Sequence, residues 1–153
     1  TLLNFVGNAV TASGTSGNIV VTINNSGSAA QGATGAQGVA LGSRTSAVMT
    51  NNEALAEQFL ISAKVAGEQF WPMPLPEELR ASLDSPVADM ANIGERMGGM
   101  LVAGLFLKEF IAPELPWLHL DIAGVELNTG KAHGHTPVGA SGISVRSLIE
   151  MAK

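Results

Sequence analysis

The sequence predicts an α/β domain, because helix and strand patterns follow one another along its charged part. Met100–Ile111 is apolar on most of its helical circumference, as expected of a helix that protein covers on nearly all sides. Trp117–Ile122 then alternates, with Trp, His and Asp on one face and Leu and Ile on the other, which indicates a strand. A length of 153 residues and an apolar share of 46% suit one domain with a substantial core.

The first part of the chain differs in composition from the rest. Residues 1–43 contain no charged side chain, and the first one along the chain belongs to Arg44. One strand is predicted here, Ile19–Ile23, which runs into an Asn-Asn-Ser-Gly turn. Because small, uncharged residues specify structure weakly, no further element is predicted in this segment.

A helix is predicted to begin at Thr50. Thr50 and Glu53 have the spacing of a capping box, in which each side chain satisfies a free backbone donor. Apolar residues then recur at helical spacing, namely Leu55, Phe59, Ala63 and Ala66. Gly67 is placed to end the helix in a left-handed conformation.

The remaining elements follow from proline and serine positions. The prolines of "WPMPLP", residues 71–76, impose an extended course until Pro76 starts a short helix. After a glycine-rich loop, Ser144 is predicted to cap a final helix, Val145–Met151. The predicted order from residue 44 is strand, helix, helix, helix, strand, loop and helix.

Composition argues against several classes of protein. A net charge of −5 with no basic stretch argues against a nucleic-acid partner. No apolar run reaches the roughly 18 residues that cross a bilayer, so no membrane partner is predicted. The absence of cysteine excludes disulfides and thiolate metal sites and fits a reducing compartment, so we predict a cytoplasmic protein.

The three histidines raise the alternative of a zinc site. His119 and Asp121 lie two apart on the predicted strand and share a face, and His133 and His135 could add two imidazoles. Against this alternative, a polar pair arises wherever one strand face meets polar neighbours, and the other two histidines sit in a glycine-flanked loop predicted to be exposed. A structural role is therefore favoured for these histidines.

The sequence also lacks the usual signals of a catalytic nucleophile. It contains no Gly-x-Ser-x-Gly elbow and no cysteine.

Several collinear segments resemble the C-terminal part of the leucyl (cytosol) aminopeptidase family. They include "ATGAQGVALGSRTSAVMTNNEALAEQ", "FWPMPLPEELRASLDSPVADMANIGERMGGMLVAGLFLKEF" and "PWLHLDIAGVELNTGKAHGHTPVGASGISVRSLI". The resemblance covers about residues 33–151, so we divide the chain into residues 1–32, of unknown role, and an aminopeptidase-like region, 33–153. It implies a partial three-layer α/β/α sandwich around a mixed sheet.

The resemblance also implies an activity and its partners. Family members are cytosolic, usually homohexameric enzymes in which two divalent cations, commonly Zn or Mn, activate a water that cleaves the first peptide bond of a peptide. Matching the family motifs residue by residue assigns substrate-binding roles to Ala33, Thr34, Gly35, Ala36, Ile93 and Ala123. In relatives, the positions of His119 and Asp121 are not metal ligands.

The sequence departs from the family where the metals bind. The family's ligands are carboxylates and a lysine upstream of the Thr-Gly-Ala loop, whereas residues 1–43 contain no acid, lysine or arginine. Hard dications need several anionic oxygens. We therefore predict no catalytic residue, no metal ligand and no bound metal for this chain alone. Glu126 stands where relatives carry an apolar or small residue, which would place a charge near the side-chain pocket.

Two classes of function remain open. The first is the C-terminal portion of a metal-dependent leucyl aminopeptidase, inactive by itself. The second is a non-catalytic structural or assembly module, because glycine recurs every third residue at Gly32, Gly35 and Gly38, the period of a triple helix. Losing the preceding strands of a central sheet would expose apolar edges, which predicts self-association or poor solubility unless residues 1–32 substitute for those strands.

Overall fold

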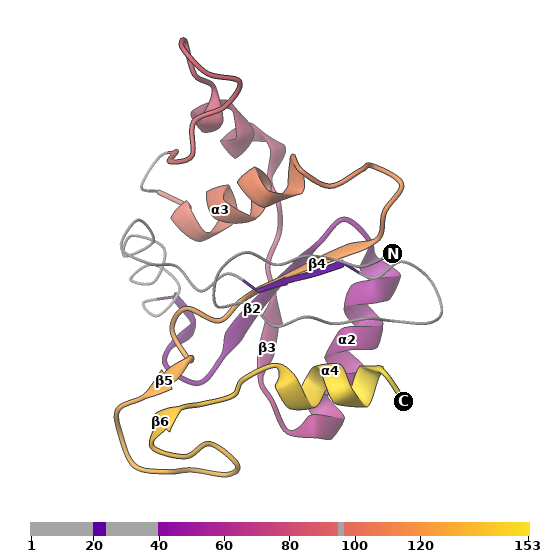
Figure 1. The fold of residues 1–153 in the computed structure, drawn as a ribbon, viewed down its shortest axis with the longest axis vertical. Helices are drawn as coiled ribbons and strands as arrows, with labels where there is room; N and C mark the ends of the chain where they lie inside the picture. The colour runs from indigo at the N-terminus through magenta and orange to yellow at the C-terminus, as the bar shows by residue number, and fades with distance from the viewer. Residues whose placement is uncertain (1–19, 24–39, 95–96) are drawn as a thin grey trace.

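The computed structural model describes residues 20–23, 40–94 and 97–153 (Figure 1). Its strands are β1 (Val20–Ile23), β2 (Ser46–Thr50), β3 (Phe70–Pro72), β4 (Trp117–Asp121), β5 (Leu127–Asn128) and β6 (Gly139–Ala140). Its helices are α2 (Glu53–Ala66), the 3-10 helix η2 (Glu77–Leu83), α3 (Gly99–Lys108) and α4 (Val145–Met151). The predicted order of elements from residue 44 onward is confirmed except for β3, which lies between α2 and η2, where only an extended connector was predicted; β5 and β6 lie inside the predicted loop.

The central sheet has the strand order β1-β4-β2-β3. β1 pairs in parallel with β4, β2 pairs in parallel with β3, and β2 and β4 are antiparallel, so the predicted mixed sheet is confirmed. The strand predicted at Ile19–Ile23 forms β1 and lies at one edge of the sheet. The segment that was predicted to be unlike the rest of the chain thus contributes an edge strand to the sheet.

Helices cover both faces of the sheet, which confirms the three layers. Val48, Leu118 and Leu120 point to one face and form a buried cluster with α2, against which α4 also packs. Ala47 and Met49 point to the other face and form a cluster with the first turn of α3. Successive side chains of a strand point to opposite faces, so both faces of β2 and β4 are buried. Figure 1 shows α3 on one side of the sheet and α2 and α4 on the other.

The predicted capping box at the start of α2 is wrong. The N-cap is Asn52, whose side-chain oxygen accepts a hydrogen bond from the backbone N–H of Leu55 at 2.9 Å. The Thr50 hydroxyl instead accepts from the backbone N–H of Asn52 and lies 2.7 Å from the carbonyl oxygen of Trp117, to which it donates. The hydroxyl therefore joins β2 to β4, and the helix begins two residues later than its sequence pattern indicates.

Of three predicted boundaries near the centre of the chain, two are confirmed and one is wrong. Gly67 ends α2 with φ 74°, as predicted, and the short helix η2 begins after Pro76, as predicted. α3 ends at Lys108 rather than Ile111, and Phe110 beyond it is 66% exposed, so the prediction of a helix enclosed by protein is wrong for its C-terminal part.

Within the described ranges, no helix combines the length and the apolar content that a membrane crossing requires.

The final helix α4 forms where predicted, but Ser144 does not cap it through its side chain. Ser144 has a left-handed backbone with φ 71° and makes no capping hydrogen bond. Glu68, just after α2, performs this role: its carboxylate accepts from the backbone N–H of Ser147 at 3.0 Å and also from the Ser147 hydroxyl. Arg146 donates to the carbonyl oxygen of Ala66. The start of α4 is thus fixed by the end of α2.

Candidate functional site

The turn that follows β4 carries Ala123, one of the predicted substrate-binding residues. Asp121 is the last residue of β4 and pairs with Ala47 on β2. Its carboxylate oxygen Oδ1 accepts a hydrogen bond from the backbone N–H of Ala123 at 3.0 Å. Both residues are buried. The backbone of the predicted pocket wall is therefore held by a side chain from the end of β4.

The charge of Asp121 is unfavourable in this position. Burial raises the pKa of the Asp121 carboxyl group above its ordinary value, the hydrogen bond from Ala123 lowers it, and the negative charge of Glu126 raises it. Burial dominates because water no longer solvates the ionised form. Glu126, identified in the sequence as an unusual charge near the pocket, therefore lies close enough to act on this turn.

We expect Asp121→Asn to change how stability depends on pH. Because folding raises the pKa of Asp121, ionisation costs stability, and this cost grows as the pH rises from the ordinary aspartate range through the raised pKa. The amide keeps an oxygen acceptor for Ala123 without a charge, so the variant should be more stable than the parent at neutral pH and lose this advantage in acid. Urea unfolding, followed by tryptophan fluorescence over a pH series, measures both effects.

Asp121→Ala is the matched control. It removes the charge and the acceptor together, so the hydrogen bond to Ala123 is lost, which costs about 1–3 kcal/mol of unfolding free energy. If Asp121→Asn follows the pH dependence of the parent chain, the buried charge of this aspartate does not control stability.

The loop between η2 and α3 carries the second described residue of the predicted pocket. Ile93 is 66% exposed there. The next residue, Gly94, packs against η2, and a Cβ atom at this position would lie only 2.4 Å from the hydroxyl oxygen of Ser82. This close approach fixes the loop and leaves the Ile93 side chain at the surface, where a ligand could contact it.

The structure describes only part of the predicted pocket. Ala33, Thr34, Gly35 and Ala36 lie outside the described residues, so their roles stay predictions. In Figure 1, the start of α3 and the end of β4, which flank Ile93 and Ala123 in the chain, lie on the same side of the view. The substrate contacts of these two residues also stay predictions.

The histidines do not form the alternative zinc site. His119 is buried in β4, opposite Met49 on β2, and its ring stacks on that of Trp117 with 6.0 Å between ring centres. His133 lies in the loop between β5 and β6, where it bridges to Thr136. In the part of the chain that the structure describes, no three His, Cys, Asp or Glu side chains gather as a metal site. These residues therefore do not fit a centre for two cations.

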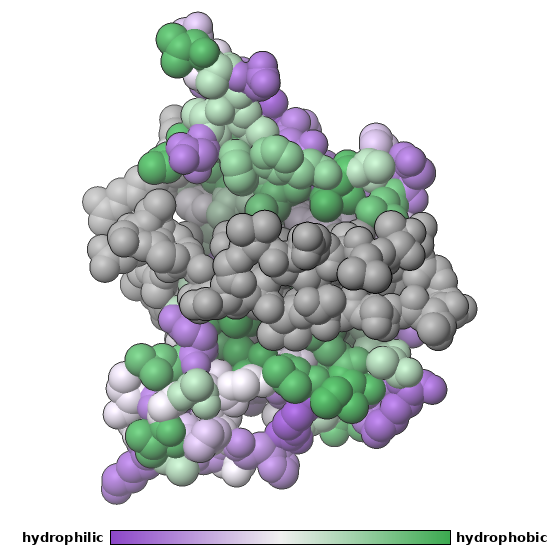
Figure 2. Space-filling view, viewed as in Figure 1, coloured by the Kyte–Doolittle hydropathy of each residue, from purple (hydrophilic) through white to green (hydrophobic). Residues whose placement is uncertain are grey.

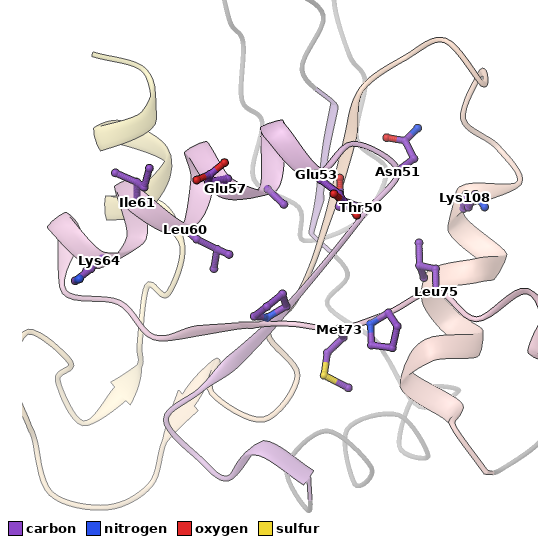
Figure 3. Close-up of a pocket in the computed structure, with 13 residues that line it drawn as sticks. Thr50, Asn51, Glu53, Glu57, Leu60, Ile61, Lys64, Met73, Leu75 and Lys108 are labelled. Atoms are coloured by element: carbon purple, nitrogen blue, oxygen red, sulfur yellow. The ribbon is translucent and has the colours of Figure 1, made fainter.

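A groove beside α2 was not predicted from the sequence (Figure 3). It has a volume of about 840 Å³, and its two walls are the outer face of α2 and the connector of alternating prolines that follows β3. Its lining residues are Thr50, Asn51, Glu53, Ala56, Glu57, Leu60, Ile61, Lys64, Pro72, Met73, Pro74, Leu75 and Lys108. The lining is apolar at its base, and its charges come from α2 and from Lys108 of α3, which suits binding of another surface better than catalysis.

Comparisons with known proteins agree on one family. Residues 29–149 match the cytosol aminopeptidase family, catalytic domain. The chain is 53% identical over 120 residues to a probable cytosol aminopeptidase of Streptomyces coelicolor, and 53% identical over 116 residues to one of Mycobacterium ulcerans. These alignments cover 78% and 75% of the chain but only 23% and 22% of the relatives. The chain therefore spans about a quarter of the length of these relatives.

Solved structures give the same relationship. The bottromycin maturation enzyme BotP in complex with Mn superposes with a TM-score of 0.78 at 38% identity, covering 88% of this chain and 28% of that one. A tomato leucine aminopeptidase mutant gives a TM-score of 0.75 at 32% identity, covering 88% and 24%. The match to the family begins at residue 29, four residues before the boundary expected from the sequence, and β1 lies upstream of it.

Proposed function

Because this chain belongs to the cytosol aminopeptidase family, we propose that it forms part of the catalytic domain of a metal-dependent enzyme that releases N-terminal amino acids from peptides. The chain would supply one wall of the pocket for the substrate's first side chain. The residues assigned to this wall are Ala33, Thr34, Gly35, Ile93 and Ala123. The observation that carries the proposal is the match over residues 29–149, supported by an Ala123 turn held by Asp121.

We assign the pocket wall to this chain and the cation site to the rest of the domain. In the family, two divalent cations, Zn or Mn, supply an activated water when bound. The described residues do not fit such a centre, and residues 1–43 contain no anionic side chain. We therefore propose that this chain alone binds no catalytic metal and has no peptidase activity.

Incubation with metal tests the assignment directly. The purified chain is incubated with zinc or manganese, desalted, analysed for metal content and assayed with a leucine anilide. We expect less than stoichiometric metal and no hydrolysis above the buffer rate, with the Streptomyces coelicolor relative as positive control. Two equivalents of metal together with turnover by this chain would contradict the assignment.

A chimera tests the pocket separately. Residues 29–149 of this chain would replace the matching segment of the Streptomyces coelicolor relative, and the chimera should hydrolyse leucine anilide. In that chimera, Ile93→Asp should raise KM for leucine anilide more than Val87→Asp, a matched change at a side chain that is 94% exposed. Equal effects of the two changes would remove Ile93 from the pocket.

We further propose a cytosolic homo-oligomer, as the family implies. Large apolar side chains remain at the surface, and Figure 2 shows them at α3 and at α4 on the face in view. Those at least 58% exposed are Ile61, Val65, Trp71, Val87, Ile93, Met97, Phe110, Leu127, Val138 and Ile149. Exposed apolar surface of this kind favours association.

A further inference from the structure

The outer face of α2 carries a stripe of opposite charges around an apolar centre. Glu57, Ile61 and Lys64 are spaced by four and three residues, so their side chains lie on one face of the helix. All three are exposed, and Ile61 is 60% exposed although it is large and apolar. Among the described residues, neither Glu57 nor Lys64 is engaged in an ion pair within the chain.

The groove described above runs along the same stripe. Figure 3 shows Glu57, Leu60, Ile61 and Lys64 along α2, with Met73 of the connector on the opposite wall. Its base is apolar, so it can accept apolar side chains from a surface that packs against α2. Four charged side chains line the groove, Glu53, Glu57, Lys64 and Lys108, and Lys108 already pairs with Glu77. Beside Ile61, the facing surface must present a cation opposite Glu57 and an anion opposite Lys64.

A second copy of the same helix meets this requirement. When two copies of α2 lie antiparallel with a twofold axis between Leu60 and Ile61, Glu57 of each copy faces Lys64 of the other, because these residues are equally far from the axis. Leu60 of each copy then faces Ile61 of the other at the centre. Twofold interfaces are self-complementary in this way. A uniformly acidic or basic partner would instead meet a like charge at one end.

We propose that two copies of this chain pair through α2, antiparallel, with Leu60 and Ile61 entering the facing grooves and two symmetric Glu57–Lys64 ion pairs at the ends. The inference rests on the proposed self-association and names the surface that mediates it. Opposite charges facing one another fix the register and orientation of such an interface, and like charges are strongly unfavourable.

Charge reversal tests the pairing in the chain of 153 residues. Glu57→Lys alone and Lys64→Glu alone each place like charges together at both ends of the interface. Sedimentation velocity over a concentration series should show self-association at least about tenfold weaker for each, or about 1.4 kcal/mol. The double variant, with both changes, restores opposite charges and should associate like the parent chain.

Mixing the two single variants gives the sharpest test. The Glu57→Lys variant has lysine at both positions 57 and 64, and the Lys64→Glu variant has glutamate at both. In a mixed pair every lysine therefore faces a glutamate, so an equimolar mixture should associate about as tightly as the parent, although neither variant does so alone. Lys131→Glu and Asp89→Lys are the matched controls, because they make comparable charge changes at exposed positions outside α2 and outside the groove lining and should leave association unchanged. Circular dichroism confirms that every variant is folded.

The outcomes separate this interface from the broader proposals. If the parent associates but the single variants associate equally well, or if the mixture stays as weak as its components, the α2 interface is wrong and self-association stands. A parent chain that stays monomeric at all concentrations overturns both self-association and this interface. The chimera assay of the pocket is unaffected by either result.

Discussion

Phe59→Ala is expected to lower the free energy of unfolding by about 3–5 kcal/mol, the usual cost of deleting a buried aromatic side chain. Phe59 is fully buried between α2 and the sheet, in one cluster with Val48, Leu118 and Leu120. Its ring also meets that of Phe70 edge-on, with 4.8 Å between ring centres. Because domains of this size are stable by only about 5–15 kcal/mol, the variant should unfold in much less urea.

Phe110→Ala is the control for this prediction. It removes the same side chain from a position that is 66% exposed, where the ring makes an edge-on contact with Phe106. We expect a loss of about 1 kcal/mol or less. Urea unfolding at one fixed protein concentration measures both variants. Equal losses would mean that the cluster around Phe59 does not dominate the stability of the fold.

Asn51→Ala should cost about 2 kcal/mol, although Asn51 is exposed and surface substitutions usually change stability by about 0.5 kcal/mol at most. Its side-chain oxygen accepts from the backbone N–H of Trp117 at 2.8 Å, and its amide donates to the carbonyl oxygen of Leu115 at 2.9 Å. Together with the Thr50 hydroxyl, these bonds hold the start of β4 against the end of β2.

Asn51→Asp separates the two bonds of this side chain. The carboxylate keeps an acceptor for the N–H of Trp117 but loses the donor to Leu115, so the variant should recover part of the stability lost by Asn51→Ala. The same urea series measures both. A loss below about 0.5 kcal/mol for Asn51→Ala would show that the other contacts of β4 hold the strand without this clamp.

Local signals predicted where the helices lie but not which side chains cap α2 and α4. The spacing of Leu55, Phe59, Ala63 and Ala66 and the glycine at 67 were sufficient to predict α2 and its end. Its start was misplaced because the Thr50 hydroxyl is used by the carbonyl of Trp117, which no local pattern reveals. The cap predicted at Ser144 failed for the same reason, since the start of α4 is held by Glu68 from the end of α2.

The candidate site could be predicted only in part. Ile93 and Ala123 were assigned through the family resemblance, because a single isoleucine or alanine gives no physical signal of binding. The aspartate two residues before Ala123 does give one, since Asp often accepts from the backbone N–H two residues on. The groove beside α2 was missed because its second wall is a proline-rich connector, and its position against the helix depends on how β3 pairs with β2.

The parallel pairing of β1 with β4 also determines when the fold can be completed during synthesis. β1 and β4 are far apart in the sequence, so this edge of the sheet cannot close until the segment between them and β4 itself have been translated. Contacts between such distant segments also form slowly, because a long loop must close first. A growing chain therefore presents an unpaired strand to neighbouring chains, and translation at low temperature should favour its correct pairing.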